Sequence, residues 1–104
     1  MVGKNARHPD VEPAHPGEFL DEIVIPATGR SKTEIAKLLG VFRHRLYDLL
    51  RKEQGVTSEM ALRLGKLFGD GPQIWLRMQI ERDLWRANRE NAAAIAKIPT
   101  LSAA

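Results

Sequence analysis

The sequence contains no cysteine and no long apolar run, and its aromatic residues are two tryptophans, one tyrosine and three phenylalanines among 104 residues. Without cysteine, the chain forms neither a disulfide nor a thiolate metal site. No stretch approaches the roughly 20 consecutive apolar residues of a membrane-spanning helix. The N-terminal stretch also lacks the apolar segment of a signal peptide, so we expect a cytoplasmic protein that does not associate with membranes.

The sequence also lacks the residue patterns that mark common catalytic sites. It has no metalloprotease or phosphate-binding motif, and its three histidines, His8, His15 and His44, are scattered. His8 and Asp10 alone make a poor metal site, because one histidine and one carboxylate fall short of a full ligand set. We therefore expect no enzyme, no bound metal and no cofactor.

Residues 31–52 show the spacing of two short helices joined by a tight turn. Ser31 and Glu34 form a capping box, which predicts a helix that begins at Lys32. Gly40 predicts its end, because glycine adopts the left-handed conformation of a sharp corner without a Cβ penalty. Apolar residues at helical spacing predict the buried faces of both helices: Ile35, Ala36, Leu38, Leu39, Val41, Leu46, Leu49 and Leu50. This pattern is typical of a helix-turn-helix, and an ordinary corner between two solvated helices is the alternative.

Positive charge is concentrated in the same segment. Residues 30–52 hold seven Lys and Arg side chains against two acidic ones, a balance of +5, whereas the whole chain carries +3. The rest of the chain is therefore slightly acidic. A basic patch on such a domain is typical of a surface that faces phosphate groups.

Three further segments show helical periodicity, and no segment shows the alternation of a strand. The first of these helices begins at Pro16 and closes at Pro26 and Gly29, the second follows Thr57, and the longest spans about residues 72–91. The second motif helix is expected to end at Gln54. We expect an all-α, five-helix domain at residues 15–91. A flexible arm at residues 1–14, in which Lys4 and Arg7 are available to a groove or a partner, precedes it, and a tail at residues 92–104 follows.

The longest helix carries apolar residues on two sides. One side has Trp75, Met78 and Trp85, and the other has Leu76, Ile80, Leu84 and Ala87. A helix with two apolar surfaces packs on two partners, so we expect one surface to face the domain and the other a second subunit. The residues assigned to the interface of this homodimer are Trp75, Met78, Ile80, Leu84 and Trp85.

Four segments together resemble the HigA-type, VapI-like antitoxins within the wider family of lambda-repressor-like, XRE-type DNA-binding proteins. They are HPGEFL at 15–20, SKTEIAKLLGV at 31–41, SEMALRLGKLFG at 58–69 and GPQIWLRMQIERDLWRA at 71–87. The resemblance implies a lambda-repressor-like fold and a homodimeric antitoxin of a type II toxin–antitoxin module. It also implies that the protein neutralises a HigB-type ribonuclease toxin of the RelE-like group and represses its own operon at a palindromic operator.

Two other binding functions stay open at this point. A stand-alone XRE-type transcriptional regulator would use the same motif without a toxin partner. A pure protein-interaction module would keep the fold without binding DNA. The flanking segments favour the antitoxin, because the helix-turn-helix alone is common to the whole XRE-type family.

The second motif helix is expected to enter the major groove of double-stranded DNA with its N-terminal end toward the base edges. Arg43 is the candidate for direct readout, because a guanidinium can bridge guanine O6 and N7, while His44 and Tyr47 are assigned to bases or phosphates. The phosphate contacts are assigned to Lys32, Thr33, Arg45, Arg51 and Lys52.

One position departs from the family that the sequence resembles. Members usually have a serine or threonine after the turn valine, where it caps the recognition helix, and this chain has Phe42. Phe42 is included in the predicted DNA-binding set. It is expected either to meet a thymine methyl group or to pack on the protein.

Overall fold

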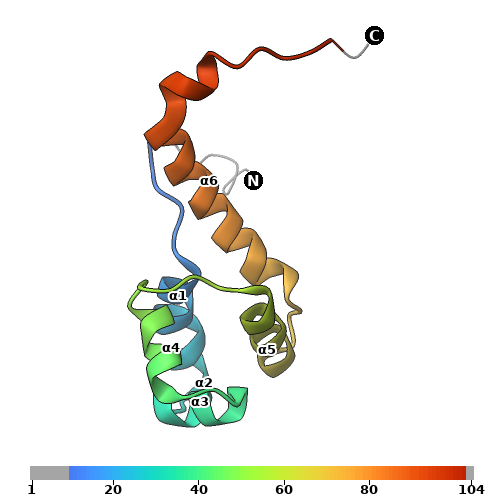
Figure 1. Ribbon diagram of the computed structural model, residues 1–104. Helices are drawn as coiled ribbons and strands as arrows, with labels where there is room; N and C mark the ends of the chain where they lie inside the picture. The colour runs from blue at the N-terminus through green and yellow to red at the C-terminus, as the bar shows by residue number, and fades with distance from the viewer. Residues whose placement is uncertain (1–9, 103–104) are drawn as a thin grey trace.

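The computed structural model describes residues 10–102, which form helices and connecting segments without a strand (Figure 1). The helices are α1 (Pro16–Phe19), η2 (Leu20–Val24), α2 (Ile25–Thr28), α3 (Lys32–Leu39), α4 (Arg43–Leu50), α5 (Ser58–Phe68) and α6 (Gln73–Ala96). The first three run end to end, so this part of the chain contains the five helices that the sequence predicts. Helices α1 to α5 form one body, from which the long α6 projects (Figure 1).

The first helix begins at Pro16 as predicted but continues through Pro26. The Nδ1 of His15 caps it by accepting a hydrogen bond of 2.9 Å from the backbone N–H of Gly17. Pro26 has no N–H to donate to the helical ladder, and the turn before it widens into the π-helical segment η2. Gly29 then ends the helix with a φ of 71°.

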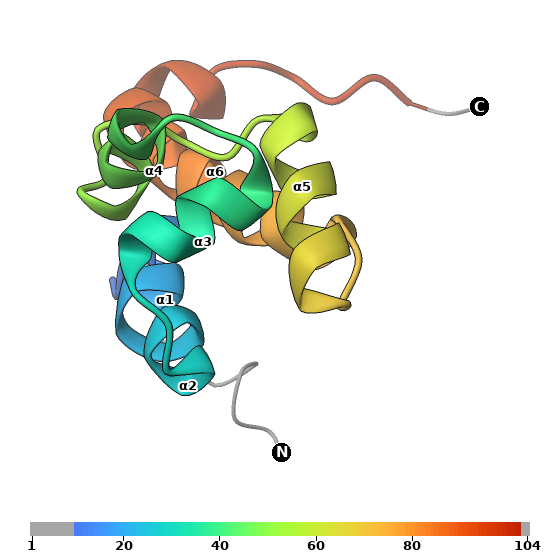
Figure 2. The same ribbon diagram turned by 90° about the horizontal axis from the view of Figure 1, so that it is seen from below.

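Helices α3 and α4 form the predicted helix-turn-helix (Figure 2). The Ser31 hydroxyl accepts a hydrogen bond of 3.1 Å from the Glu34 N–H, and Gly40 ends α3 with a φ of 75°. The predicted apolar faces are buried at Ile35, Ala36, Leu39, Leu46, Leu49 and Leu50. Leu38 differs, because it is exposed on the far side of α3.

The body contains two places where only glycine fits. A Cβ atom on Gly17 would lie 1.9 Å from the carbonyl oxygen of Leu49, so α1 meets the backbone of α4 directly. A Cβ atom on Gly65 would lie 2.3 Å from the carbonyl carbon of Gly71, so α5 is in contact with the loop that leads to α6. These two close approaches fix α4 and the start of α6 against the rest of the body.

Helix α4 ends at Leu50, before the predicted end at Gln54. Lys52 has a left-handed φ of 65°, and the carbonyl of Asp48 accepts a hydrogen bond of 3.2 Å from the Gln54 N–H. Arg51 and Lys52 therefore lie in the turn that follows α4 rather than on the helix itself.

Trp75 anchors α6 to the body. Its side chain is fully buried, its Nε1 donates a hydrogen bond of 3.1 Å to the Asp70 carboxylate, and its ring contacts those of Phe19 and Phe68. The assignment of Trp75 to a dimer interface is therefore wrong, because its own chain encloses the side chain. Met78, assigned to the same interface, packs partly against this core.

Residues 10–14, predicted as the end of a flexible arm, lie along α6 (Figure 1). The buried Arg82 donates a hydrogen bond of 2.9 Å to the Pro13 carbonyl and lies 3.2 Å from the Glu12 carboxylate. Arg86 binds the same carboxylate, and this hydrogen bond together with the charge of Arg82 lowers the pKa of Glu12. The segment is held because the Glu12 carboxylate neutralises Arg82, which would otherwise be buried without a partner, and the Pro13 carbonyl accepts a hydrogen bond from it.

Helix α6 continues past the predicted end at residue 91. Asn91 interrupts it with a φ of −122° and a ψ of 15°, after which the helix extends to Ala96 and an extended segment follows (Figure 1). Lys4 and Arg7 of the predicted arm lie outside the described residues. Within residues 10–102, no helix combines the length and the apolar character that crossing a membrane requires.

His15 is expected to make the fold sensitive to acid. Its side chain is 5% exposed, and burial, followed by the charges of Arg82 and Lys52, lowers its pKa below the ordinary value of 6.5. The folded protein keeps His15 neutral at a pH where the unfolded chain protonates it, so stability falls as the pH drops below about 6.5. Protonation also removes the Nδ1 acceptor that caps α1.

The test compares the free energy of unfolding in urea at about pH 7.5 and about pH 5.5. The control variant is His15→Asn, because asparagine is a good N-cap residue that does not titrate. We expect the wild-type protein to lose more stability over this interval than the variant. Equal losses in the two proteins would remove His15 as the origin of the acid sensitivity.

Candidate nucleic-acid interface

The outward face of α4 forms a shallow groove on the surface of the body. Its walls are Phe42, Arg43, His44, Tyr47 and Arg51. All five belong to the predicted DNA-binding set, and the structure brings them together because the leucines of α4 occupy the opposite, buried face. The groove is open to solvent and lined by cations and aromatic rings.

Cations flank Tyr47 on this face. The Nζ of Lys32 and the guanidinium of Arg51 each lie 5.7 Å from the centroid of the Tyr47 ring. Cations at this distance are attracted to the face of an aromatic ring. Tyr47 therefore holds one cation from α3 and one from the turn after α4 at the rim of the groove.

The cations at the edge of the interface form exposed ion pairs within the protein. Lys32 lies 3.1 Å from Asp21, and Lys52 lies 3.7 Å from Glu18. Exposed pairs contribute only about 0–1 kcal/mol, so these side chains can turn to a phosphate at small cost. Thr33 is exposed beside Lys32 on α3.

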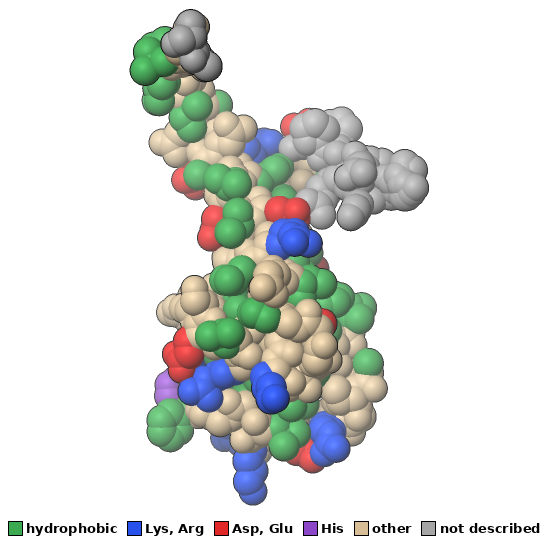
Figure 3. All heavy atoms as spheres, turned by 90° about the vertical axis from the view of Figure 1, so that its right-hand side faces the viewer, with side chains coloured by type: hydrophobic (Ala, Val, Ile, Leu, Met, Phe, Trp, Pro, Cys, Tyr) green, Lys and Arg blue, Asp and Glu red, His purple; other side chains and the backbone are tan. Residues whose placement is uncertain are grey.

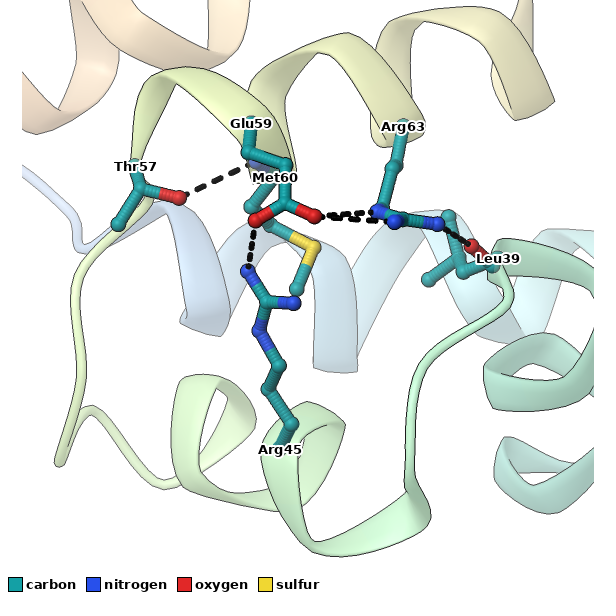
Figure 4. A network of polar contacts seen from close by, with 6 residues as sticks. All are labelled: Leu39, Arg45, Thr57, Glu59, Met60 and Arg63. Carbon is teal, nitrogen blue, oxygen red and sulfur yellow. Dashed lines mark hydrogen bonds and ion pairs between the residues drawn. The ribbon is translucent and has the colours of Figure 1, made fainter.

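Arg45, predicted to contact phosphate, points to α5 (Figure 4). Its guanidinium lies 3.2 Å from the Glu59 carboxylate, which also accepts a hydrogen bond of 2.9 Å from Arg63. Arg63 in turn donates a hydrogen bond of 2.8 Å to the Leu39 carbonyl at the end of α3 (Figure 4). The hydrogen bonds from Arg63 and Arg45 lower the pKa of Glu59. Arg45 therefore links α4 to α5, and through Arg63 to α3, by an exposed ion pair of the same kind as those of Lys32 and Lys52.

Two supports of this interface are not predictable from the sequence. The i, i+4 spacing of Glu59 and Arg63 signals a pair on α5, but spacing carries no information about its link to α4. Gln79 of α6 supports the turn after α4, because its Oε1 accepts a hydrogen bond of 2.8 Å from the Val56 N–H. Gly55 lies against the same side-chain amide, so a Cβ atom there would push the end of the Gln79 side chain aside.

Phe42 occupies the N-cap position of α4 without making a capping hydrogen bond. Its side chain is 79% exposed, and its ring is nearly parallel to that of His44, with centroids 5.9 Å apart. Of the two expectations for Phe42, packing on the protein is limited to this contact with the His44 ring. The contact with a thymine methyl group stays a prediction.

The residues assigned to the dimer interface lie on α6, apart from the DNA-binding surface. Figure 3 shows hydrophobic side chains along the α6 stalk and Lys and Arg side chains around the body. Of the residues assigned to the dimer interface, Ile80 is 54% exposed and Leu84 is 64% exposed. Trp85 is half-buried, with the Arg89 guanidinium 4.7 Å from its ring centroid. Ile80 and Leu84 therefore form the exposed part of the predicted interface.

Known proteins are similar to this chain in both sequence and architecture. The chain is 36% identical over 98 residues to virulence-associated protein I of Dichelobacter nodosus, covering 94% of this chain and 87% of that protein. It superposes on the antitoxin HigA of Pseudomonas aeruginosa, solved with the higBA promoter, with a TM-score of 0.80 and 32% identity. That match covers 88% of this chain and 100% of the other. The chain belongs to the HigA antitoxin family.

Another solved HigA-like structure is the antitoxin GraA in complex with its operator. It matches this chain with a TM-score of 0.80 and 34% identity, covering 89% of this chain and 95% of GraA. No family model matches the sequence. These relatives cover most of the chain. They confirm the resemblance to HigA-type antitoxins that the four sequence segments indicate.

The uncapped start of α4 predicts that Phe42→Ser stabilises the fold. A serine hydroxyl at this position can accept a hydrogen bond from a free N–H of the first turn, which contributes about 1 kcal/mol. Removal of a ring that is 79% exposed takes little apolar surface out of the core. We expect an increase of about 1 kcal/mol in the free energy of unfolding, measured by urea denaturation.

Phe42→Ala is the matched control, because it removes the ring without supplying a hydroxyl. It is expected to change stability by less than about 0.5 kcal/mol, as surface substitutions usually do. A serine variant no more stable than the alanine variant would contradict the missing-cap account.

Proposed function

We propose that this HigA-family chain is the antitoxin of a type II toxin–antitoxin module, which binds a palindromic operator as a homodimer and neutralises a HigB-type toxin. The observation that carries the DNA-binding part is the cation-lined groove on the outward face of α4, fixed by the buried leucines behind it. Two relatives of similar fold, solved with a promoter or an operator, support it.

In this proposal the N-terminal end of α4 points to the base edges of the major groove. Arg43 is exposed at that end and supplies direct readout, with His44 and Tyr47 beside it on the groove wall. Lys32, Thr33, Arg51 and Lys52 are placed to hold the phosphate backbone. Arg45 is assigned to the phosphate backbone as well, since it can leave its exposed ion pair with Glu59 at small cost.

The homodimer is proposed to form through the exposed apolar pair on α6, Ile80 and Leu84. Two copies related by a two-fold axis present two α4 helices, which then meet half-sites about 34 Å apart on one side of the duplex. The operator is therefore expected to be an inverted repeat. Affinity for it is expected to fall steeply with salt, because bound cations displace counterions from the phosphates.

The toxin partner separates this proposal from the alternative, a stand-alone transcriptional regulator with the same DNA chemistry. Purification of the full chain after expression together with the neighbouring gene product is the direct test. Co-elution of a small ribonuclease, followed by a gel shift on the upstream DNA, is the expected result. A chain that shifts this DNA but elutes without a partner would favour the stand-alone regulator.

Arg43 and Arg51 are predicted to contribute to DNA binding in different ways. Arg43→Ala is expected to weaken binding to the operator by about 1–3 kcal/mol and to relax sequence preference, because a base contact is lost. Arg51→Ala is expected to weaken operator and random duplex alike and to reduce the salt slope by about 1.

Fluorescence anisotropy titrations of both variants on both duplexes at several salt concentrations give these quantities. Each arginine serves as the control for the other, since both side chains are exposed cations on one groove. Equal losses on operator and random duplex for Arg43→Ala would remove its assignment to base readout.

Leu84→Glu is predicted to break the homodimer without disturbing the fold. The side chain is 64% exposed in the single chain, so a carboxylate there meets water in the monomer and apolar surface in the dimer. Leu62→Glu on α5 is the matched control, because Leu62 is 61% exposed and lies outside the proposed interface. Light scattering over a concentration series is expected to show a dimer dissociation constant at least about tenfold higher for Leu84→Glu only.

A dimer of unchanged stability in Leu84→Glu would move the interface away from this face of α6. A loss in both variants would instead assign the interface to a surface that includes α5. Circular dichroism of each variant confirms that the helices are intact before the masses are compared.

A further inference from the structure

Phe42 stands out among the aromatic residues of the described chain. The rings of Phe19, Phe68 and Trp75 contact one another around the core, whereas the Phe42 side chain is 79% exposed. Its backbone is fixed, because the Phe42 carbonyl accepts a hydrogen bond of 3.0 Å from the Arg45 N–H. The ring therefore leaves the protein from a well-defined point at the start of α4.

The position of the ring is more informative than its exposure. Phe42 lines two surface grooves that meet at the start of α4, and His44 lines both of them. One groove contains Arg43 and Tyr47, which the proposed function assigns to DNA. The nearly parallel His44 ring, 5.9 Å away, limits how the phenyl ring can turn. An apolar group is thus held at the end of α4 that points to the base edges.

The chemistry of a phenyl ring restricts what it can recognise there. The ring carries no charge and no hydrogen-bond donor, so it gains little from a phosphate or from the polar edges of the bases. In the major groove, the one apolar group that a standard base pair presents is the C5-methyl group of thymine. Burying this methyl against the ring removes apolar surface of both partners from water.

We infer that Phe42 is a specificity-determining residue that reads a thymine methyl group in each operator half-site, and that His44 is the positioning residue that holds its ring. This inference rests on the proposed binding of operator DNA. It assigns a selective role to the residue that replaces the usual capping side chain. A wedge inserted between base steps is the other use of an exposed aromatic residue on DNA, and it belongs to the minor groove.

The test starts from a duplex enriched from random double-stranded DNA on the full-length chain. Each thymine of this duplex is replaced in turn by deoxyuridine, which removes only the methyl group. Affinities are measured by fluorescence anisotropy at one salt concentration. For the wild-type protein we expect one thymine per half-site whose replacement weakens binding about fourfold, the equivalent of one buried methyl group.

Three variants test whether the effect of the thymine methyl group depends on the Phe42 ring. In Phe42→Ala, the sensitive thymine is expected to lose its effect, so the thymine and deoxyuridine duplexes bind equally. In His44→Ala, the effect is expected to shrink, because the ring is no longer held. In Arg51→Ala, which weakens binding through the phosphates, the fourfold effect is expected to persist.

The outcomes that overturn the inference are distinct from failure of the proposed function. A flat deoxyuridine scan for the wild-type protein, or an equal loss in wild-type and Phe42→Ala proteins, overturns methyl reading while DNA binding stands. A Phe42→Ala variant that loses affinity without any sensitive thymine indicates a wedge and also overturns it. Failure to enrich any duplex overturns the proposed function itself.

Discussion

The whole interface depends on one constraint, the burial of the apolar face of α4 while its cationic face stays outside. Leu46 and Leu49 are buried behind the helix, and α1 approaches so closely that Gly17 has no room for a Cβ atom. Arg45 and Glu59 tie another side of α4 to α5. A turn of α4 by one residue, about 100°, would expose Leu46 and bury a cation without a partner, which costs several kcal/mol. The cationic face is therefore fixed before any partner binds.

Helix α6 is likewise oriented by the burial of an apolar face, but it has two apolar surfaces where α4 has one. Trp75 commits one surface to the chain's own core, and Arg82 follows it along the same side. Burial of Arg82 is tolerable because Glu12 and the Pro13 carbonyl satisfy its guanidinium. The N-terminal segment thereby completes the side of α6 that belongs to its own chain. The other apolar surface of α6, around Leu84, stays exposed to solvent. It is therefore the candidate for contact with a second copy of the chain.

Local signals were sufficient wherever one residue sets the backbone. The cap at Ser31 and the left-handed corner at Gly40 lie where the sequence predicts them. Periodicity indicates two apolar surfaces on the last helix but not which one meets the core, so the predicted interface takes residues from both and wrongly includes the buried Trp75. The roles of Arg45 and Arg82 depend on partners 14 and 69–70 residues away, and no spacing rule reaches that far. The groove was predictable, whereas the contacts that hold it in place were not.

Two departures from ordinary helix design lie at the two ends of α4. Phe42 starts the helix without a capping hydrogen bond, and Lys52 follows its end with a φ of 65° that glycine adopts more easily. Each departure costs on the order of 1 kcal/mol. Helices α3 and α5, by contrast, have the side-chain caps Ser31 and Thr57. Local rules are expected to fail at functional sites, and both ends of α4 border the cation-lined surface. The proposed DNA contact therefore offers a reason for both departures, since they lie where α4 would meet the duplex.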